Sequence, residues 1–196
     1  ALEGASRIHF AFGKTARTGG TDIAFCDSQY GNRGTSVAFR MNLAASNSKG
    51  WEGSYMRTTI CKQFENVIPA ALRSVLKTVT KYSDNTGGTG ITGSEANAAR
   101  VTSTTDIFYL LSELEVRGIT SHANSYEANK QRQFDYYKAG NSQSKYKHDS
   151  TETRVPWFSR SVVIKSGYQF VYILRDNYTS NGNANISYAF SPAFCV

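Results

Sequence analysis

Long apolar runs, metal-ligand spacings and the signature motifs of common enzymes are all missing from this sequence. No apolar run reaches the length that crosses a bilayer, so we expect no membrane insertion. The three cysteines, Cys26, Cys61 and Cys195, form no Cys-x-x-Cys pair, which argues against a zinc site. We expect them to be buried small hydrophobes in a protein made in a reducing compartment, and a single disulfide is left open.

Motifs for hydrolysis and phosphate binding are also missing. No Gly-x-Ser-x-Gly elbow is present, and the run Gly87-Gly88-Thr89-Gly90 lacks the lysine that a phosphate-binding loop requires. The histidines lie in polar or alternating contexts: His9, His122 and His148. The carboxylates that could meet in space as a glycosidase pair each have an ordinary structural interpretation: Asp106, Glu113 and Glu115. We therefore predict that the protein is not an enzyme and uses no cofactor or metal.

The net charge is +7, but the 22 basic residues are spread along the chain. The densest basic patch and the acidic residues that offset it are Lys130, Arg132, Lys138, Lys145 and Lys147 against Glu127, Asp135 and Asp149. Nucleic-acid binders cluster their cations on one element or interleave them with aromatic residues. We therefore expect no nucleic-acid partner, whereas an acidic glycan or a cell-surface partner would suit a mildly basic surface equally well.

What the chain does contain is typical of one globular domain. Its 196 residues are 40% hydrophobic and 13% aromatic, which is enough to bury a sizeable core. The sequence begins at Ala1 with neither a methionine nor a leader peptide. We favour the interpretation that residues 1–196 are a single ligand-binding domain, the C-terminal module of a longer chain.

The first part of the chain is interpreted as scaffold. Glycine-separated apolar segments predict a meander of three strands: Ile8–Phe12, Asp22–Phe25 and Val37–Arg40. Apolar residues at helical spacing between Trp51 and Val67 predict a helix, with Ser54 as its cap. Pro69 then opens a second helix. Its buried side is expected to be Ala70, Leu72, Val75 and Leu76.

The middle of the chain alternates strands with polar stretches. Residues 78–82 and 106–111 are expected to be strands, and 83–103 a flexible surface excursion. The Ser112-x-x-Glu115 pattern is a capping box, so Glu115 should bond back to the helix cap. Residues 119–153 are polar and expected to be irregular, with a helical turn at Phe134–Tyr137.

The segment from Val155 to Val196 has a different composition. Apolar stretches at its two ends are interpreted as framework, together with Trp157, Arg160 and Phe194. Between them lies a run rich in Tyr, Ser, Asn and Gly, the residues that antibody loops use for contact. Aromatic residues in a polar field supply anchoring area, which favours a contact surface over an ordinary polar loop. The pair Asp176-Asn177 predicts a type I′ hairpin turn inside this run.

Four segments in order carry a resemblance to a known family: Gly50-Trp51-Glu52-Gly53-Ser54-Tyr55-Met56-Arg57, Asp106 to Glu115, Trp157-Phe158-Ser159-Arg160-Ser161, and Ser191-Pro192-Ala193-Phe194-Cys195. The chain resembles, from about Arg7 onward, C-type-lectin-like domains of the formylglycine-generating-enzyme type from phage and gut bacteria. Some members are variable proteins that diversity-generating retroelements rewrite. A near-copy of the codons for Val155–Val196 just downstream, differing mainly at adenines, would be the genomic sign of that process.

The resemblance implies a variable-type binding segment at 162–188, and the departures from the family pattern limit it. Val162 stands where the family has proline, and Asn177 where it usually has glycine. The calcium-binding motifs of animal lectins are absent, and no cysteine pair matches the copper ligands of formylglycine-generating enzymes. Neither calcium-dependent sugar binding nor that oxidase activity is expected.

These observations together predict an α+β, C-type-lectin-like fold with mixed antiparallel sheets, two or more helices and long irregular loops. The predicted function is non-enzymatic capture of a protein or glycan receptor, as a phage receptor-binding protein or bacterial adhesin on a virion or cell surface. The alternatives are a structural virion module, in which case a homo-oligomer within a larger assembly is expected, and a glycan-active enzyme. The predicted ligand-binding residues are Val163, Ile164, Lys165, Ser166, Tyr168, Gln169, Tyr172, Leu174, Ser180, Asn181, Gly182, Asn183, Asn185, Ile186 and Tyr188.

Overall fold

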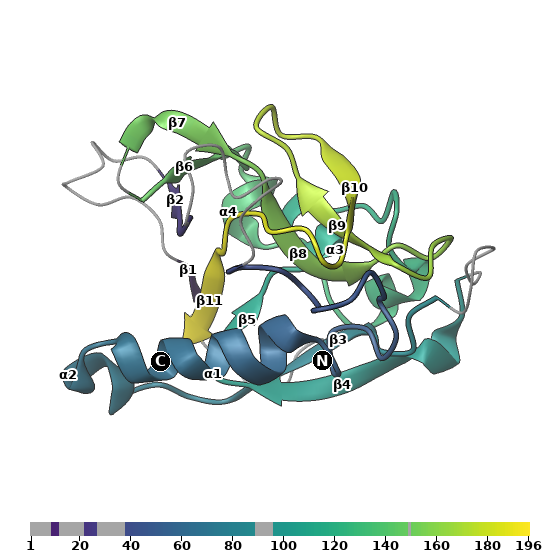
Figure 1. Ribbon diagram of the computed structural model, residues 1–196, viewed down its shortest axis with the longest axis horizontal. Coiled ribbons are helices and arrows are strands. Elements are labelled where there is room, and N and C mark those ends of the chain that lie inside the picture. Colours follow the sequence, from purple (N-terminus) through teal and green to yellow (C-terminus); the bar gives the residue numbers. More distant parts are fainter. Residues whose placement is uncertain (1–8, 12–21, 27–37, 89–95, 149) are drawn as a thin grey trace.

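Short strands form small sheets, and short helices pack around them, in the part of the chain that the structure describes (Figure 1). The structure is a computed structural model, and it describes residues 9–11, 22–26, 38–88, 96–148 and 150–196. The strands are β1 (His9–Ala11), β2 (Ile23–Ala24), β3 (Val79–Asp84), β4 (Val101–Asp106), β5 (Tyr109–Leu110), β6 (Lys145–Lys147), β7 (Ser150–Val155), β8 (Trp157–Val162), β9 (Gln169–Ile173), β10 (Thr179–Asn183) and β11 (Pro192–Cys195). The helices are η1 (Met56–Cys61), α1 (Lys62–Val67), α2 (Ala70–Arg73), η2 (Ala98–Arg100), α3 (Glu113–Arg117), η3 (Ser125–Asn129) and α4 (Asp135–Lys138). The predicted α+β class is therefore confirmed.

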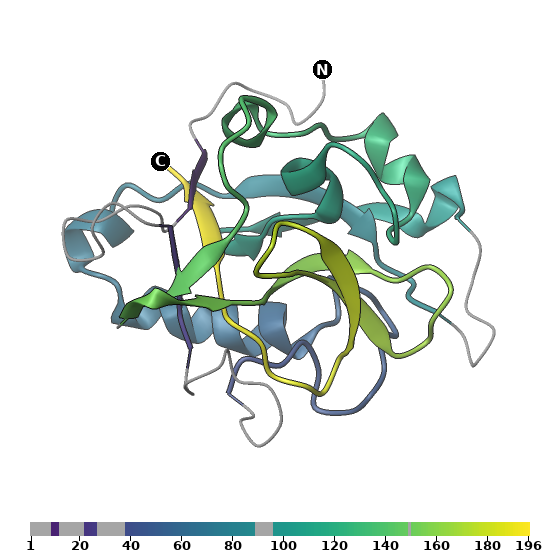
Figure 2. The same ribbon diagram turned by 90° about the horizontal axis from the view of Figure 1, so that it is seen from above.

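Two of the sheets decide the architecture. The first has the order β1-β11-β5, so the first and last described strands pair with each other, with His9 opposite Cys195 (Figure 2). The second has the order β10-β9-β8 and is built from consecutive antiparallel strands. The remaining strands form the sheet β2-β6-β7 and the hairpin β3-β4, and the hairpin and α1 both appear at the bottom of Figure 1.

The predicted amino-terminal meander is wrong. β1 pairs with β11, whereas β2 pairs in parallel with β6, so the two segments belong to different sheets. Residues 38–40 form no strand beyond an isolated bridge from Arg40 to Ser187, and Val37 lies outside the described residues. The local pattern correctly placed extended residues in the first two segments, but it contains no information on which distant strand each one meets.

The predicted long helix forms, but its buried stripe is shorter than expected. The Ser54 hydroxyl accepts a hydrogen bond from the Arg57 N–H at 3.1 Å, which confirms the cap. Trp51 lies before the helix, and Val67 is 74% exposed. The first turns are π-helical, which widens the turn and rotates later residues away from the face that a 3.6-residue period predicts. Val75, predicted to be buried after Pro69, is also exposed.

The Gly- and Thr-rich stretch 83–103 is not a surface excursion throughout. Ser83 and Asp84 are buried at the end of β3, and Gly87 and Gly88 are buried beyond it. Residues 89–95 lie outside the described residues. Other local predictions are confirmed: the Ser112–Glu115 capping box forms, and α4 begins one residue after Phe134.

The core is aromatic and includes charged side chains. The largest fully buried residues include Trp51, Trp157, Tyr109, Arg160 and Lys81. The three cysteines are buried, as predicted, and all three are free, which decides the question of a disulfide that the sequence left open. No described helix is long and apolar enough to cross a membrane.

Candidate functional site

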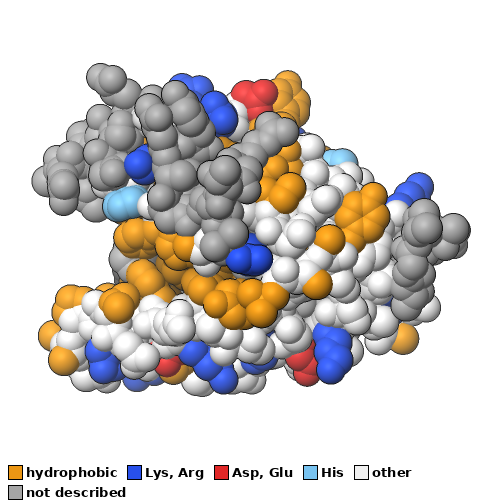
Figure 3. Space-filling view, in the orientation of Figure 1, with side chains coloured by type: hydrophobic (Ala, Val, Ile, Leu, Met, Phe, Trp, Pro, Cys, Tyr) orange, Lys and Arg blue, Asp and Glu red, His pale blue; other side chains and the backbone are white. Residues whose placement is uncertain are grey.

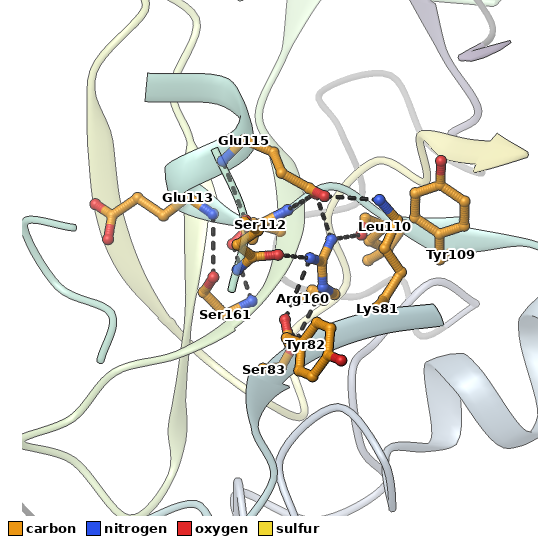
Figure 4. Close-up of polar contacts among 12 residues, drawn as sticks. Lys81, Tyr82, Ser83, Tyr109, Leu110, Ser112, Glu113, Glu115, Arg160 and Ser161 are labelled. Atoms are coloured by element: carbon orange, nitrogen blue, oxygen red, sulfur yellow. Dashed lines mark hydrogen bonds and ion pairs between the residues drawn. The ribbon is translucent and has the colours of Figure 1, made fainter. Parts of the chain in front are cut away.

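Arg160 holds together the framework from which the C-terminal segment extends (Figure 4). Its side chain is fully buried on β8. The guanidinium donates to the Ser83 hydroxyl at 2.9 Å and to the Leu110 carbonyl at 2.7 Å, and it forms an ion pair with Glu115. It also donates to Gln131. One side chain therefore connects β3, β5, β8 and α3, which confirms the prediction that Arg160 is framework.

The pKa values of two buried glutamates beside Arg160 are shifted in opposite directions. Burial alone would raise the pKa of Glu115, but the charges of Arg160 and of Lys81, whose Nζ lies 2.8 Å away, outweigh it and hold that pKa well below its usual range. Burial raises the pKa of Glu127 to about 8 against the opposing charge of Arg160. Glu127 accepts hydrogen bonds from the Asp84 N–H, the Gln131 amide and the Ser161 hydroxyl.

The other candidate carboxylates also have structural partners. Asp106 accepts from the Trp51 indole at 3.1 Å and pairs with Arg57 at 2.6 Å. Glu113 accepts from the Ala123 N–H at 2.8 Å and from the Thr179 hydroxyl at 3.1 Å. Among the described residues, no group of three or more His, Cys, Asp or Glu side chains is arranged to hold a metal ion. Each carboxylate fixes one element to another, as the sequence interpretation held.

The β9–β10 hairpin forms, with a turn that differs from the predicted type. The Leu174 N–H donates to the Tyr178 carbonyl at 2.7 Å, so the loop consists of Arg175, Asp176 and Asn177. A type I′ turn needs two consecutive residues with positive φ, but Asn177, at φ 70°, is the one described residue of this loop with that conformation. The turn is therefore longer than predicted because Asp176 keeps negative φ.

Tyr172 on β9 packs within the sheet rather than standing free. Its ring stacks on that of Tyr188 with centroids 4.4 Å apart. Gly182, across the strand pair, leaves room for both rings, because a Cβ there would come within 2.7 Å of the Tyr188 ring and 3.0 Å of the Tyr172 ring. Tyr172 therefore keeps only part of its surface for contact with a ligand.

Five members of the predicted ligand set, each exposed or half-buried, lie where two turns meet, at the end of the sheet opposite the Asn177 loop. We call this group the turn-end surface, and its members are Lys165, Tyr168, Asn183, Asn185 and Ile186. Lys165, Tyr168 and Asn185 are exposed, and the other two are half-buried. The Ala184 N–H donates to the Tyr168 carbonyl at 2.8 Å, and the Ile186 N–H donates to the Asn183 carbonyl at 3.0 Å, so the two turns lie side by side.

The structure does not bring all the predicted ligand residues to this surface. Four are buried, and we correct their predicted exposure: Val163, Ser166, Gly182 and Tyr188. Five are half-buried within or beside the sheet: Ile164, Gln169, Tyr172, Ser180 and Asn181. Leu174 lies at the opposite end of β9. Val163, Ser166 and Tyr188 lie outside the strands, where packing against distant segments decides burial and side-chain polarity alone does not predict it.

Asn47 supports the turn-end surface, and the sequence analysis missed it. Its buried amide donates to the Ser166 carbonyl at 2.6 Å and to the Gln169 carbonyl at 2.8 Å, and it accepts from the Gly88 N–H at 2.8 Å. A Cβ on Gly88 would lie 2.3 Å from the Ser166 carbonyl oxygen, so only glycine allows this close approach. Local patterns could not reveal these contacts, because Asn47 lies more than a hundred positions from the turn that it holds.

The two sides of the face in Figure 3 differ in character. Hydrophobic side chains gather above α1, whereas the side that holds the β8–β10 sheet is mostly polar with isolated hydrophobic side chains. Exposed aromatic residues that belong to the C-terminal segment are Tyr168, at 41%, and Tyr178, at 64%. The segment therefore presents single aromatic anchors in polar surroundings.

Comparison with known proteins gives a family but no function. The family model that matches is described as a domain of unknown function, DUF6273, and it matches residues 35–196, which is most of the chain. The chain therefore belongs to the DUF6273 family. No curated protein and no solved structure matches it.

Proposed function

We propose that this member of the DUF6273 family is a non-enzymatic binding protein that captures a protein or glycan receptor with its turn-end surface. The finer fold assignment that belongs to this proposal is the C-type-lectin-like fold, with 162–188 as the variable-type segment. The proposed location is the surface of a virion or of a bacterial cell, where receptor capture would serve attachment.

The observation that carries the proposal is the contrast between a buried framework and the turn-end surface beside it. β8 is buried at all six positions and is fixed by the Arg160 network, whereas Lys165 and Tyr168 are exposed a few residues beyond its end and Asn185 is exposed in the adjoining turn. The two turns that display them are held by backbone hydrogen bonds and by the Asn47 amide. A backbone fixed in this way loses little conformational entropy on binding, and its exposed side chains can change without disturbing the core.

The test is a triple substitution on the turn-end surface, Lys165→Ala, Tyr168→Ala and Asn185→Ala, assayed on glycan arrays and on a panel of bacterial cells. We expect at least about a tenfold loss of capture, because removing an aromatic anchor commonly costs more than about 1 kcal/mol. The melting temperature should change little, since exposed substitutions rarely shift stability by more than about 0.5 kcal/mol.

The matched control is the triple substitution Tyr126→Ala, Asn129→Ala and Lys130→Ala on η3. Tyr126 is 42% exposed, close to the value for Tyr168, and Asn129 and Lys130 are exposed. The control should bind like the unmodified protein. Equal binding by both triple variants, or no binding by the unmodified protein to any glycan or cell tested, would overturn the proposal.

A further inference from the structure

β10 leaves one side of its backbone without partners. Backbone hydrogen bonds join Leu174 to Tyr178 at one end of the β9–β10 pair and Tyr168 to Ala184 at the other. Along an antiparallel ladder, hydrogen-bonded pairs alternate with pairs that are not hydrogen-bonded. Thr179, Asn181 and Asn183 therefore turn their N–H and C=O groups away from β9. The Asn183 carbonyl accepts from Ile186, and within the described residues the other groups on this side have no partner.

The edge also lacks the usual protection. Proteins commonly blunt an exposed strand edge with charged residues, proline or a bulge. β10 reads Thr-Ser-Asn-Gly-Asn, with no charge and no proline, and its pairing with β9 shows no bulge. The edge of β4, in contrast, is covered by a charged side chain: Arg57 donates to the Thr105 carbonyl and forms an ion pair with Asp106. Figure 1 shows β10 at the outer margin of its sheet.

A second observation lies at the centre of the same strand. The side-chain Oδ1 of Asn181 is buried and has no hydrogen-bond partner within the described structure. A buried polar atom without a partner costs about 1–3 kcal/mol, so turning this side chain outward to a donor at the open edge would relieve that cost. An asparagine amide is such a donor.

We propose that the chain forms a twofold homodimer by antiparallel pairing of the outer edge of β10 with the same edge of a second copy. A register centred on Asn181 places this residue opposite itself and Thr179 opposite Asn183, which uses all the open backbone groups. Because β10 carries no charge, the twofold brings no like charges together within the strand pair. With the Asn181 side chains turned toward the twofold axis, the amide of Asn181 in the second copy would supply the donor that Oδ1 lacks.

The proposal goes beyond receptor capture and does not depend on it. Pairing would join two three-stranded sheets into one continuous sheet. The two turn-end surfaces would lie at opposite ends of that sheet, since the paired strands run in opposite directions.

The experiment measures association of the purified protein alone, by sedimentation velocity from about 1 μM to about 1 mM, since small interfaces are weak. We expect a monomer–dimer equilibrium that strengthens when sodium chloride rises from about 0.15 to about 0.5 M, because salt screens the repulsion between two copies of charge +7. Amide hydrogen exchange at Thr179 and Asn181 should slow as the dimer forms.

The decisive variant is Asn181→Pro, with Ser103→Pro as its matched control. Both prolines replace an outward N–H on an edge strand, so neither breaks a bond within its own sheet. Asn181→Pro should weaken dimerisation at least tenfold, and Ser103→Pro should leave it unchanged. If Asn181→Pro folds poorly, Asn181→Lys and Asn181→Asp serve instead: each should be monomeric alone, and their mixture should form a heterodimer.

Two results would overturn the proposal: an unmodified protein that stays monomeric at the highest concentration, or a dimer that all three Asn181 variants leave intact. Strand pairing with a different polypeptide, without self-association, would also overturn it. The assay contains no ligand, so failure of the dimer leaves receptor capture standing. Failure of capture, in turn, leaves the dimer standing.

Discussion

At the scale of single residues, Glu115 and Glu127 show how position decides chemistry. Both are fully buried glutamates close to Arg160. Glu115 bonds directly to two cations, which stabilises its charged form. Glu127 receives only neutral donors, so desolvation dominates and favours its protonated form. Nothing in the local sequence of either residue distinguishes the two cases.

The unmodified protein should become less stable as pH rises, and Glu127→Gln should not show this decrease. The folded pKa of Glu127 is about 8, above its value in the unfolded chain, so between roughly pH 4 and pH 8 the unfolded state binds fewer protons. The unfolding free energy of the unmodified protein should therefore fall across this window. Urea unfolding at several pH values measures it. Glu52→Gln, at an exposed position, is the control, and an unchanged slope in Glu127→Gln would contradict the assignment.

At the scale of elements, the β9–β10 hairpin is fixed by its turn as much as by its ladder. Asn177 adopts φ 70°, and its side-chain oxygen accepts from the Gln143 N–H and the Ser144 hydroxyl, each at 3.0 Å. The turn is therefore attached to the segment before β6. An asparagine serves both purposes, because it tolerates positive φ and carries an acceptor.

Substitutions of Asn177 separate these two contributions. Asn177→Gly keeps the backbone conformation and loses the acceptor, which should lower the unfolding free energy by about 1–2 kcal/mol. Asn177→Ala loses both, and a positive φ costs alanine about 1 kcal/mol more. Urea unfolding of the two variants gives the difference. An equal loss in both variants would mean that the backbone conformation contributes nothing.

At the scale of the whole molecule, the fold is closed by the pairing of its two ends. β11 lies between β1 and β5, and all four of its residues are buried. Ala193 pairs with Ala11 on one side and with Tyr109 on the other. Such contacts between distant parts of the chain form late and hold the domain as one cooperative unit.

Removal of residues 1–11 should therefore destabilise the whole domain rather than fray one end. Loss of β1 exposes an apolar edge of β11, so we expect a lower melting temperature and association that increases with protein concentration. Differential scanning calorimetry and light scattering measure the two effects. Removal of residues 1–8 keeps β1 and serves as the comparison. A melting temperature that is the same for both truncations would show that β1 contributes little.

Most local features were predicted correctly where the interacting groups are close in sequence, although the type of the β9–β10 turn was not. The capping box joins Ser112 to Glu115, and the β9–β10 hairpin joins segments separated by a short loop. Features that depend on distant groups were missed or wrong. The strand partners of β1 and β2 and the role of Asn47 all depend on segments far away in the chain.

The sequence by itself determined the class of the fold, the local caps, the β9–β10 hairpin and a C-terminal segment rich in contact residues, because these follow from neighbouring side chains and backbone preferences. Only the tertiary structure decided which of those residues reach the surface. It placed Lys165 and Tyr168 on an exposed rim, buried Tyr188 against Tyr172, and left the outer edge of β10 open. Burial and strand pairing depend on groups that meet only when the chain folds, and no local pattern encodes them.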